Sequence, residues 1–213
     1  YHHSPKLLAT SVVFILAMGL WTNYFNELAD LPNNMQEAFE MIMRNPLGII
    51  AVVIMAPIVE ELLFRGAIQG HLLRKWKHPA GAIVLSSLIF GVVHGNWVQA
   101  PFAFVTGLAL GWMYYRTGSL LPGILMHFVN NSAAVISFLS ADDPNATMVS
   151  TYGQTGAALM AAGGMVLTII CVLFIQKKLV PQPAVWHQPA QAETIEIENN
   201  TLSSQTHSHN ENI

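Results

Sequence analysis

The sequence predicts an all-α fold, a polytopic transmembrane bundle of about six helices, and three observations support this fold class. Of the 213 residues, 53% are hydrophobic and only 10% are charged, whereas soluble domains carry about 25% charged residues. The apolar residues form long runs, most of them near the roughly 20 residues that cross a bilayer as a helix. Except for Glu60 and Glu61, the charged residues lie outside these runs, in the connecting segments and in a polar C-terminal stretch. Membrane lipid is therefore an expected partner, and no basic stripe indicates a nucleic acid.

Six apolar segments can be separated in order along the chain. They cover residues 7–25, 46–64, 79–98, 101–115, 120–139 and 155–176. The first segment has an alternative interpretation as a signal peptide, but no small-x-small cleavage site follows it, and it ends in aromatic residues typical of a membrane interface. The fourth segment is the weakest, because at 1.5 Å per residue it covers only about 22 Å.

The basic residues predict the orientation of these helices. If the segments alternate in direction, all nine Lys and Arg residues except Arg44 fall on one side. Cytoplasmic loops are enriched in Lys and Arg, so we expect a multi-pass protein of the cell membrane with both ends in the cytoplasm. Residues 1–180 form the expected membrane domain, and the proline-containing polar stretch 181–213 is predicted to be disordered. The chain begins at Tyr1 rather than at methionine, which is consistent with a truncated start.

Two adjacent carboxylates, Glu60 and Glu61, end the apolar run of the second segment. Ionisable groups inside a membrane are costly, about 2.5–3.5 kcal/mol even on insertion scales, and by default they indicate function. Residues four apart share a helix face, so Glu61 can pair with Arg65 while Glu60 points elsewhere. We therefore expect Glu61 and Arg65 to form a structural pair and Glu60 to face a cavity as a general base.

Two further segments carry histidines among apolar neighbours. The third contains Phe90 and His94, and the fifth contains His127 and Asn131, each pair spaced to share one helix face. Glycines at small-xxx-small spacing accompany these segments and allow membrane helices to approach closely. Counted from the predicted cytoplasmic boundaries, Glu60 and His127 lie about 10–15 Å deep and His94 about 22 Å.

Other hydrolase signatures do not occur. The sequence contains no His-Glu-x-x-His, Gly-x-Ser-x-Gly or Gly-x-Gly-Asp motif, which argues against serine chemistry. The three polar motifs on separate apolar segments instead favour water activated by carboxylate and imidazole groups.

In their order along the chain, Glu60-Glu61-x-x-x-Arg65, Phe90-x-x-x-His94 and His127-x-x-x-Asn131 resemble the CAAX-processing and bacteriocin-processing protease family. The resemblance covers roughly residues 46–139 and implies a helical membrane endopeptidase acting on membrane-anchored peptides or proteins. It further implies that Glu60 activates the attacking water, that His94 helps to hold it, and that His127 with Asn131 stabilises the oxyanion.

The need for a metal stays open at this point. Members of the family are often described as metalloproteases, and Glu60, His94 and His127 would supply two histidines and one carboxylate to zinc. A metal-free glutamate mechanism uses the same residues, and we favour it because no helix offers a ligand pair at i, i+4 spacing. Two other functions compete with the endopeptidase: a catalytically silent peptide-binding, immunity or scaffold protein of the same fold, and a transporter that uses the histidines.

Overall fold

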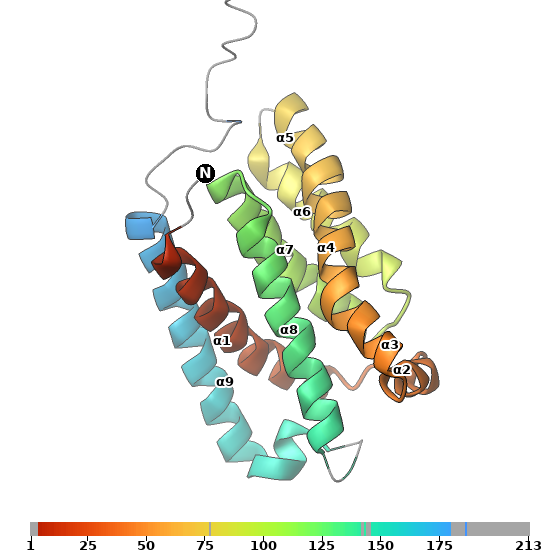
Figure 1. The fold of residues 1–213 in the computed structure, drawn as a ribbon. Helices are drawn as coiled ribbons and strands as arrows, with labels where there is room; N and C mark the ends of the chain where they lie inside the picture. The colour runs from red at the N-terminus through yellow and green to blue at the C-terminus, as the bar shows by residue number, and fades with distance from the viewer. Residues whose placement is uncertain (1–3, 77, 142, 144–145, 180–185, 187–213) are drawn as a thin grey trace, which may run out of the picture.

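The computed structural model describes residues 4–76, 78–141, 143, 146–179 and 186, and all regular structure in this part of the chain is helical (Figure 1). The helices are α1 (Pro5–Ala29), α2 (Gln36–Met43), α3 (Pro46–Ile50), η1 (Ala51–Met55), α4 (Ala56–Glu60), η2 (Glu61–Gln69), α5 (Gly70–Lys75), α6 (Pro79–Val93), α7 (Gln99–Thr117), α8 (Leu121–Ser140), α9 (Met148–Phe174) and η3 (Ile175–Leu179). The predicted all-α class is confirmed.

The segments α3, η1, α4, η2 and α5 join into one rod, in which η1 and η2 are wider π-helical turns. The predicted end of this helix at residue 64 is wrong, because the rod continues to Lys75. The short helix α2 was not predicted, since its apolar residues are interrupted by glutamates. The third predicted segment ends early, at Val93.

Four helical stretches are long and apolar enough to cross a membrane: Pro5–Ala29, Pro46–Lys75, Leu121–Ser140 and Met148–Leu179. They correspond to the first, second, fifth and sixth predicted segments. Helix α6 is apolar but shorter, and α7 does not reach the same mean hydropathy over the required length. All six predicted segments are therefore helical, and four of them meet the criterion for a membrane span.

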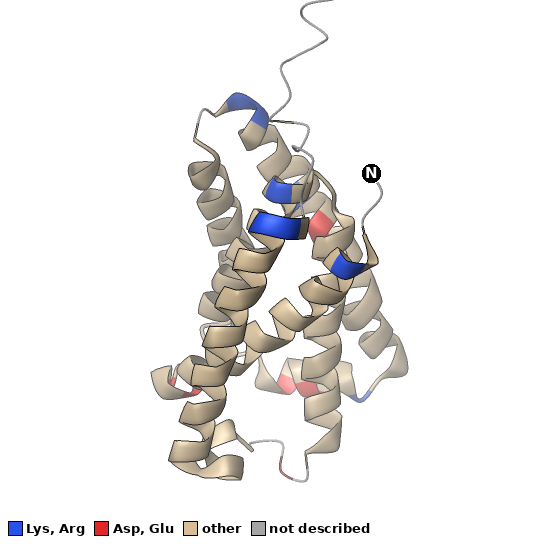
Figure 2. Cartoon of the chain, turned by 90° about the vertical axis from the view of Figure 1, so that its left-hand side faces the viewer, with Lys and Arg blue, Asp and Glu red and all other residues tan. Residues whose placement is uncertain are grey.

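Charged residues separate toward the two ends of the bundle. Figure 2 shows most Lys and Arg at the end where the N-terminus lies, and most Asp and Glu at the opposite end. The N-terminus of α1 and the C-terminal ends of α5 and α9 share the first end (Figure 1). The assignment of the basic end to the cytoplasm stays a prediction from the distribution of Lys and Arg.

Of the predicted disordered stretch 181–213, only Trp186 is described, and the remaining residues lie outside the described part. Its indole N–H donates to the carbonyl oxygen of Tyr115 at 2.9 Å, and its ring packs edge-on against Tyr114. The chain therefore contacts the end of α7 at this point.

Helices α1 and α9 pack closely along much of their length, and Gly164 lies at their contact. A Cβ atom there would lie 2.6 Å from the carbonyl oxygen of Ala17 and 2.9 Å from the Cβ of Leu20. Only glycine fits without moving one helix. The neighbouring Gly163 faces open space, since its Cβ would meet nothing within 4 Å.

These two adjacent glycines provide a matched test of the helix pairing. We expect Gly164→Ala to lower the free energy of unfolding by about 1–3 kcal/mol, because overpacking forces the backbones apart. Gly163→Ala should instead leave stability unchanged or raise it by up to about 1 kcal/mol, since alanine favours helix. Denaturant unfolding in detergent measures both, and equal effects of the two substitutions would contradict the close packing.

Candidate active site

The Glu61–Arg65 ion pair lies at the centre of the bundle. The Arg65 Nη1 group donates to Glu61 Oε1 at 2.8 Å, and each side chain is only 1% exposed. The spacing of four residues predicted this contact. Because both charges are removed from water, each depends on the other for compensation.

Arg65 also connects the rod to two other helices. Its Nη2 group donates to the carbonyl oxygen of Gly107 on α7 at 3.2 Å, and its guanidinium lies 4.3 Å from the centre of the Phe90 ring on α6. A Cβ at Gly107 would lie 3.3 Å from Nη2 and 3.0 Å from the Cβ of Ser87. The absence of a side chain at Gly107 therefore lets α7 approach Arg65.

One turn after Arg65, Gln69 makes a second hydrogen bond to a glycine carbonyl of α7. Gln69 was not among the predicted site residues. Its amide donates to the carbonyl oxygen of Gly111 at 2.8 Å and accepts from the Ser86 hydroxyl at 3.1 Å. The side chain is fully buried. The available signal was the i, i+4 spacing of Glu61, Arg65 and Gln69, which places three polar side chains along one face.

His127 from α8 lies between the two glutamates and is 4% exposed. Its Nδ1 is 3.2 Å from Glu61 Oε1, and its Nε2 is 3.7 Å from Glu60 Oε2. A carboxylate accepts hydrogen bonds, so the Nδ1 proton is directed to Glu61 and Nε2 faces Glu60. Glu61 thus orients the imidazole as well as pairing with Arg65, a second role that spacing within one helix did not predict.

Glu60 is the more accessible of the two carboxylates, with a side chain that is 30% exposed. Its Oε2 atom is nevertheless buried and has no hydrogen-bond partner among the described residues. Buried polar atoms are normally paired, and an orphan requires an explanation. The separation of 3.7 Å from His127 is too long for a direct hydrogen bond and leaves room for a polar group that contacts both.

His94 ends α6 with a defined tautomer. Its Nδ1 lies 2.7 Å from the carbonyl oxygen of Phe90. Because a carbonyl only accepts, Nδ1 must carry the proton, and Nε2 is then free to accept a hydrogen bond. The Phe90 ring packs edge-on against both His94 and His127, at 4.8 and 5.8 Å between ring centres. The Phe90 ring therefore contacts both imidazole rings and limits their orientation.

Two asparagines before α2 form hydrogen bonds with the turn that follows His94. Neither was among the predicted site residues. Asn34 donates to the carbonyl oxygen of Gly95 at 3.1 Å and accepts from the backbone N–H of Trp97 at 3.2 Å. Asn33 accepts from the Asn96 amide at 3.0 Å. A loop distant in sequence thus fixes the end of α6, and no local pattern indicates such a pairing.

Asn131, which was predicted to act together with His127, forms a hydrogen bond with the rod instead. Its amide donates to the backbone carbonyl of Val52 at 2.9 Å, and its Oδ1 accepts from Asn130 at 3.3 Å. The structure therefore brings Glu60, Glu61 and His127 together, and His94 packs against Phe90. Asn131 contacts the rod at Val52, about two turns before Glu60.

The longer rod removes the predicted difference in depth between Glu60 and His94. With the rod ending at Lys75, Glu60 lies about 15 residues, or roughly 22 Å, from its basic end. His94 was expected at about the same depth. The error came from placing the end of the helix at residue 64.

The set Glu60, His94 and His127 does not form a metal site in this arrangement. Among the described residues, no group of three His, Cys, Asp or Glu side chains is placed to hold a metal ion. Zinc requires its ligands at about 2.0–2.2 Å in a tetrahedron, and these three side chains are not gathered in that way.

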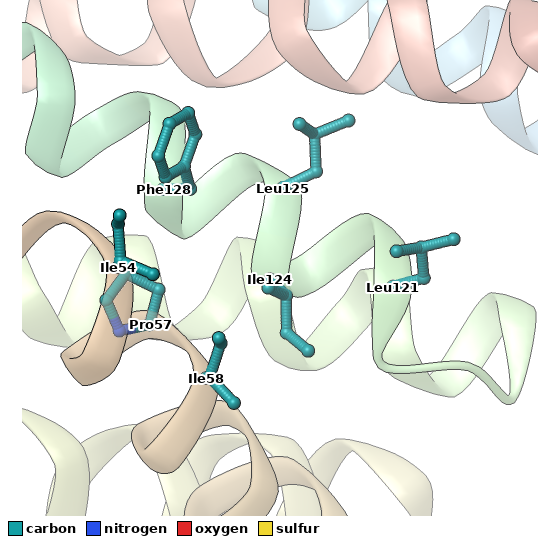
Figure 3. A pocket seen from close by; sticks show the side chains of 7 residues that line it. All are labelled: Ile54, Pro57, Ile58, Leu121, Ile124, Leu125 and Phe128. Carbon is teal, nitrogen blue, oxygen red and sulfur yellow. The ribbon is translucent and has the colours of Figure 1, made fainter.

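An apolar groove of about 180 Å³ opens between α4 and α8 (Figure 3). Its lining residues are Ile54, Pro57, Ile58, Leu121, Ile124, Leu125 and Phe128. Pro57 and Ile58 lie within one turn of Glu60, and Phe128 follows His127 directly. The groove between α4 and α8 therefore lies next to Glu60 and His127.

Comparison with known proteins finds one matching family model and two similar membrane proteins. Residues 43–133 match the family model described as "Type II CAAX prenyl endopeptidase Rce1-like". The chain is 33% identical over 103 residues to a putative membrane peptidase, YdiL, of Bacillus subtilis, covering 48% of this chain and 42% of the relative. It is 30% identical over 108 residues to the membrane-embedded CAAX protease MroQ of Staphylococcus aureus, covering 48% and 44%. No solved structure matches significantly.

The matched region contains all of the predicted site residues. The chain spans less than half the length of these two relatives. Together with its four membrane-spanning helices, the similarity identifies an integral membrane protein.

Proposed function

We propose that this chain is an intramembrane endopeptidase of the CAAX-processing and bacteriocin-processing family, a proposal supported by the family match of residues 43–133 and by the two similar membrane proteins. It hydrolyses a peptide bond of a membrane-associated substrate with water activated by Glu60. The observation that carries this proposal is the buried Oε2 atom of Glu60, which has no hydrogen-bond partner in the described part of the chain and faces His127 Nε2 at 3.7 Å.

The contact of His127 Nδ1 with the Glu61 carboxylate leaves Nε2 free to accept a proton on the side of Glu60. This arrangement supports the following steps of hydrolysis. Glu60 takes a proton from water as the water oxygen attacks the substrate carbonyl, and a tetrahedral oxyanion forms. The proton passes to His127 Nε2, and the resulting N–H donates to the oxyanion. The same proton then moves to the leaving amine as the C–N bond breaks. Glu61 holds His127 Nδ1 throughout, so that Nε2 stays directed to the reacting atoms.

His94 contributes by holding water. Its Nδ1 proton is used on the carbonyl oxygen of Phe90, which leaves Nε2 to accept a hydrogen bond from the attacking water. Such preorganised acceptors and donors in a partly dry site are more effective than the same groups in bulk water.

The apolar part of the substrate has a suitable location in the groove between α4 and α8. The groove is lined only by apolar side chains and adjoins Glu60. A segment that reaches it from the bilayer exchanges lipid for protein contacts and brings its peptide bond to the carboxylate. The accessible side of Glu60 is consistent with such an approach.

A membrane-anchored peptide reporter tests this function with the chain reconstituted in lipid vesicles. We expect His127→Ala and His94→Ala to lower the cleavage rate by about 10²–10⁴-fold, the range associated with loss of proton transfer or of a positioned donor. The matched control is His71→Ala on α5, because this histidine is exposed and should leave cleavage unchanged.

Mass spectrometry of the products supplies the second measurement. A single cleavage position supports an endopeptidase. Reporter binding without cleavage by the wild-type chain would instead indicate the silent peptide-binding protein, and full activity of both histidine variants would refute the assigned roles.

A further inference from the structure

The π-helical turn before Glu60 leaves one backbone carbonyl without its regular donor. In η1, the N–H of Ala56 donates to the carbonyl of Ala51, five residues earlier. The next bond in this register would run from residue 57 to the carbonyl of Val52. Residue 57 is proline, which has no N–H. The Val52 carbonyl therefore has no backbone partner in this register, within a helix that crosses the membrane.

An unpaired carbonyl at this depth is costly, because the bilayer offers no water to replace the missing donor. The Asn131 amide lies 2.9 Å from the Val52 oxygen and donates to it. A proline inside a membrane helix is commonly tolerated when a side chain of a neighbouring helix satisfies the freed carbonyl. Asn131 on α8 provides such a side chain here.

We propose that Asn131 is a positioning residue, whose amide replaces the N–H that Pro57 lacks and so fixes the helix of Glu60 against α8. Four residues before Asn131, the same helix carries His127, which faces Glu60. The rod and α8 are thus joined at two levels, through the Val52 carbonyl and through the hydrogen bond of His127 with Glu61. This role rests on the proposed function, and it differs from the oxyanion contact that the family resemblance implies.

The test is a double-mutant cycle with Pro57, because Pro57→Ala returns the missing backbone donor. Asn131→Leu keeps the size of the side chain but removes the donor. We expect Asn131→Leu to lower reporter cleavage by roughly 10- to 100-fold, the effect of one unsatisfied buried carbonyl. In the Pro57→Ala background the same substitution should cost less than about threefold.

Thermal unfolding of the same four proteins in detergent gives a readout that does not depend on activity. Asn131→Leu should lower the melting temperature by roughly 2–8 °C, and Pro57→Ala should restore most of this loss. As a control for specificity, Pro57→Ala should not rescue cleavage by His127→Ala, since that variant lacks a reacting group.

Three outcomes decide the proposal. Coupling of the two sites in both readouts supports it, and no coupling in melting temperature overturns it. Recovery of melting temperature without recovery of cleavage also overturns it, because Asn131 would then contact the reacting atoms. If the wild-type chain cleaves no reporter, the proposed function fails, and the melting cycle alone still decides whether Asn131 compensates for Pro57.

Discussion

Glu60→Gln is expected to lower the cleavage rate by about 10²–10⁴-fold, the contribution typical of a general base, while the protein stays folded. The amide has the shape of the carboxylate but cannot take a proton from water. The Glu60 carboxylate lies 3.7 Å from His127, beyond direct hydrogen-bond distance, and its side chain is 30% exposed, so we expect its charge to contribute little to the fold. Reporter cleavage in vesicles and thermal unfolding in detergent, measured on the same preparation, separate the two effects.

An exposed glutamate outside the candidate site provides the control for Glu60→Gln. Glu37 in α2 is exposed, and Glu37→Gln should change neither cleavage nor unfolding. Wild-type cleavage by Glu60→Gln would remove the base from the proposed mechanism. Loss of folding in the same variant would show that the carboxylate stabilises the bundle instead.

The sequence was sufficient where the contact lies within one helix. The spacing of Glu61 and Arg65 predicted their ion pair, because residues four apart share a face. The different surroundings of Glu60 and Glu61 followed from the same geometry. The cost of charges in apolar segments also selected the residues of the candidate site in advance.

Contacts between helices could not be predicted in this way. The Nδ1 contact of His127 with Glu61 and the Asn131 contact with Val52 join residues more than 60 positions apart. They depend on how α8 lies against the rod. The π-helical register of η1 is equally hidden, since residues 51–55 are all apolar and carry no signal that distinguishes five-residue from four-residue bonding.

Arg65→Met should be among the most destabilising single substitutions in the chain, lowering the free energy of unfolding by about 3–5 kcal/mol. The change leaves the Glu61 carboxylate buried without its cation and removes the donor of the Gly107 carbonyl. The exposed pair Arg44–Glu40 has the same spacing, at 4.0 Å, and Arg44→Met should cost less than about 1 kcal/mol. Denaturant titration measures the free energy of unfolding of both variants. An equal decrease in the two would contradict the burial of the Glu61–Arg65 pair.

The double variant Glu61→Met/Arg65→Met separates the two roles of Glu61. Replacing both members of a buried ion pair by apolar residues often restores stability, because no uncompensated charge remains. We therefore expect the double variant to recover at least about half of the stability lost by Arg65→Met. Cleavage should stay lost, because His127 Nδ1 no longer has the acceptor that directs Nε2 to Glu60. Recovery of cleavage together with stability would show that Glu61 serves only to balance Arg65, and that His127 is oriented by its packing against Phe90.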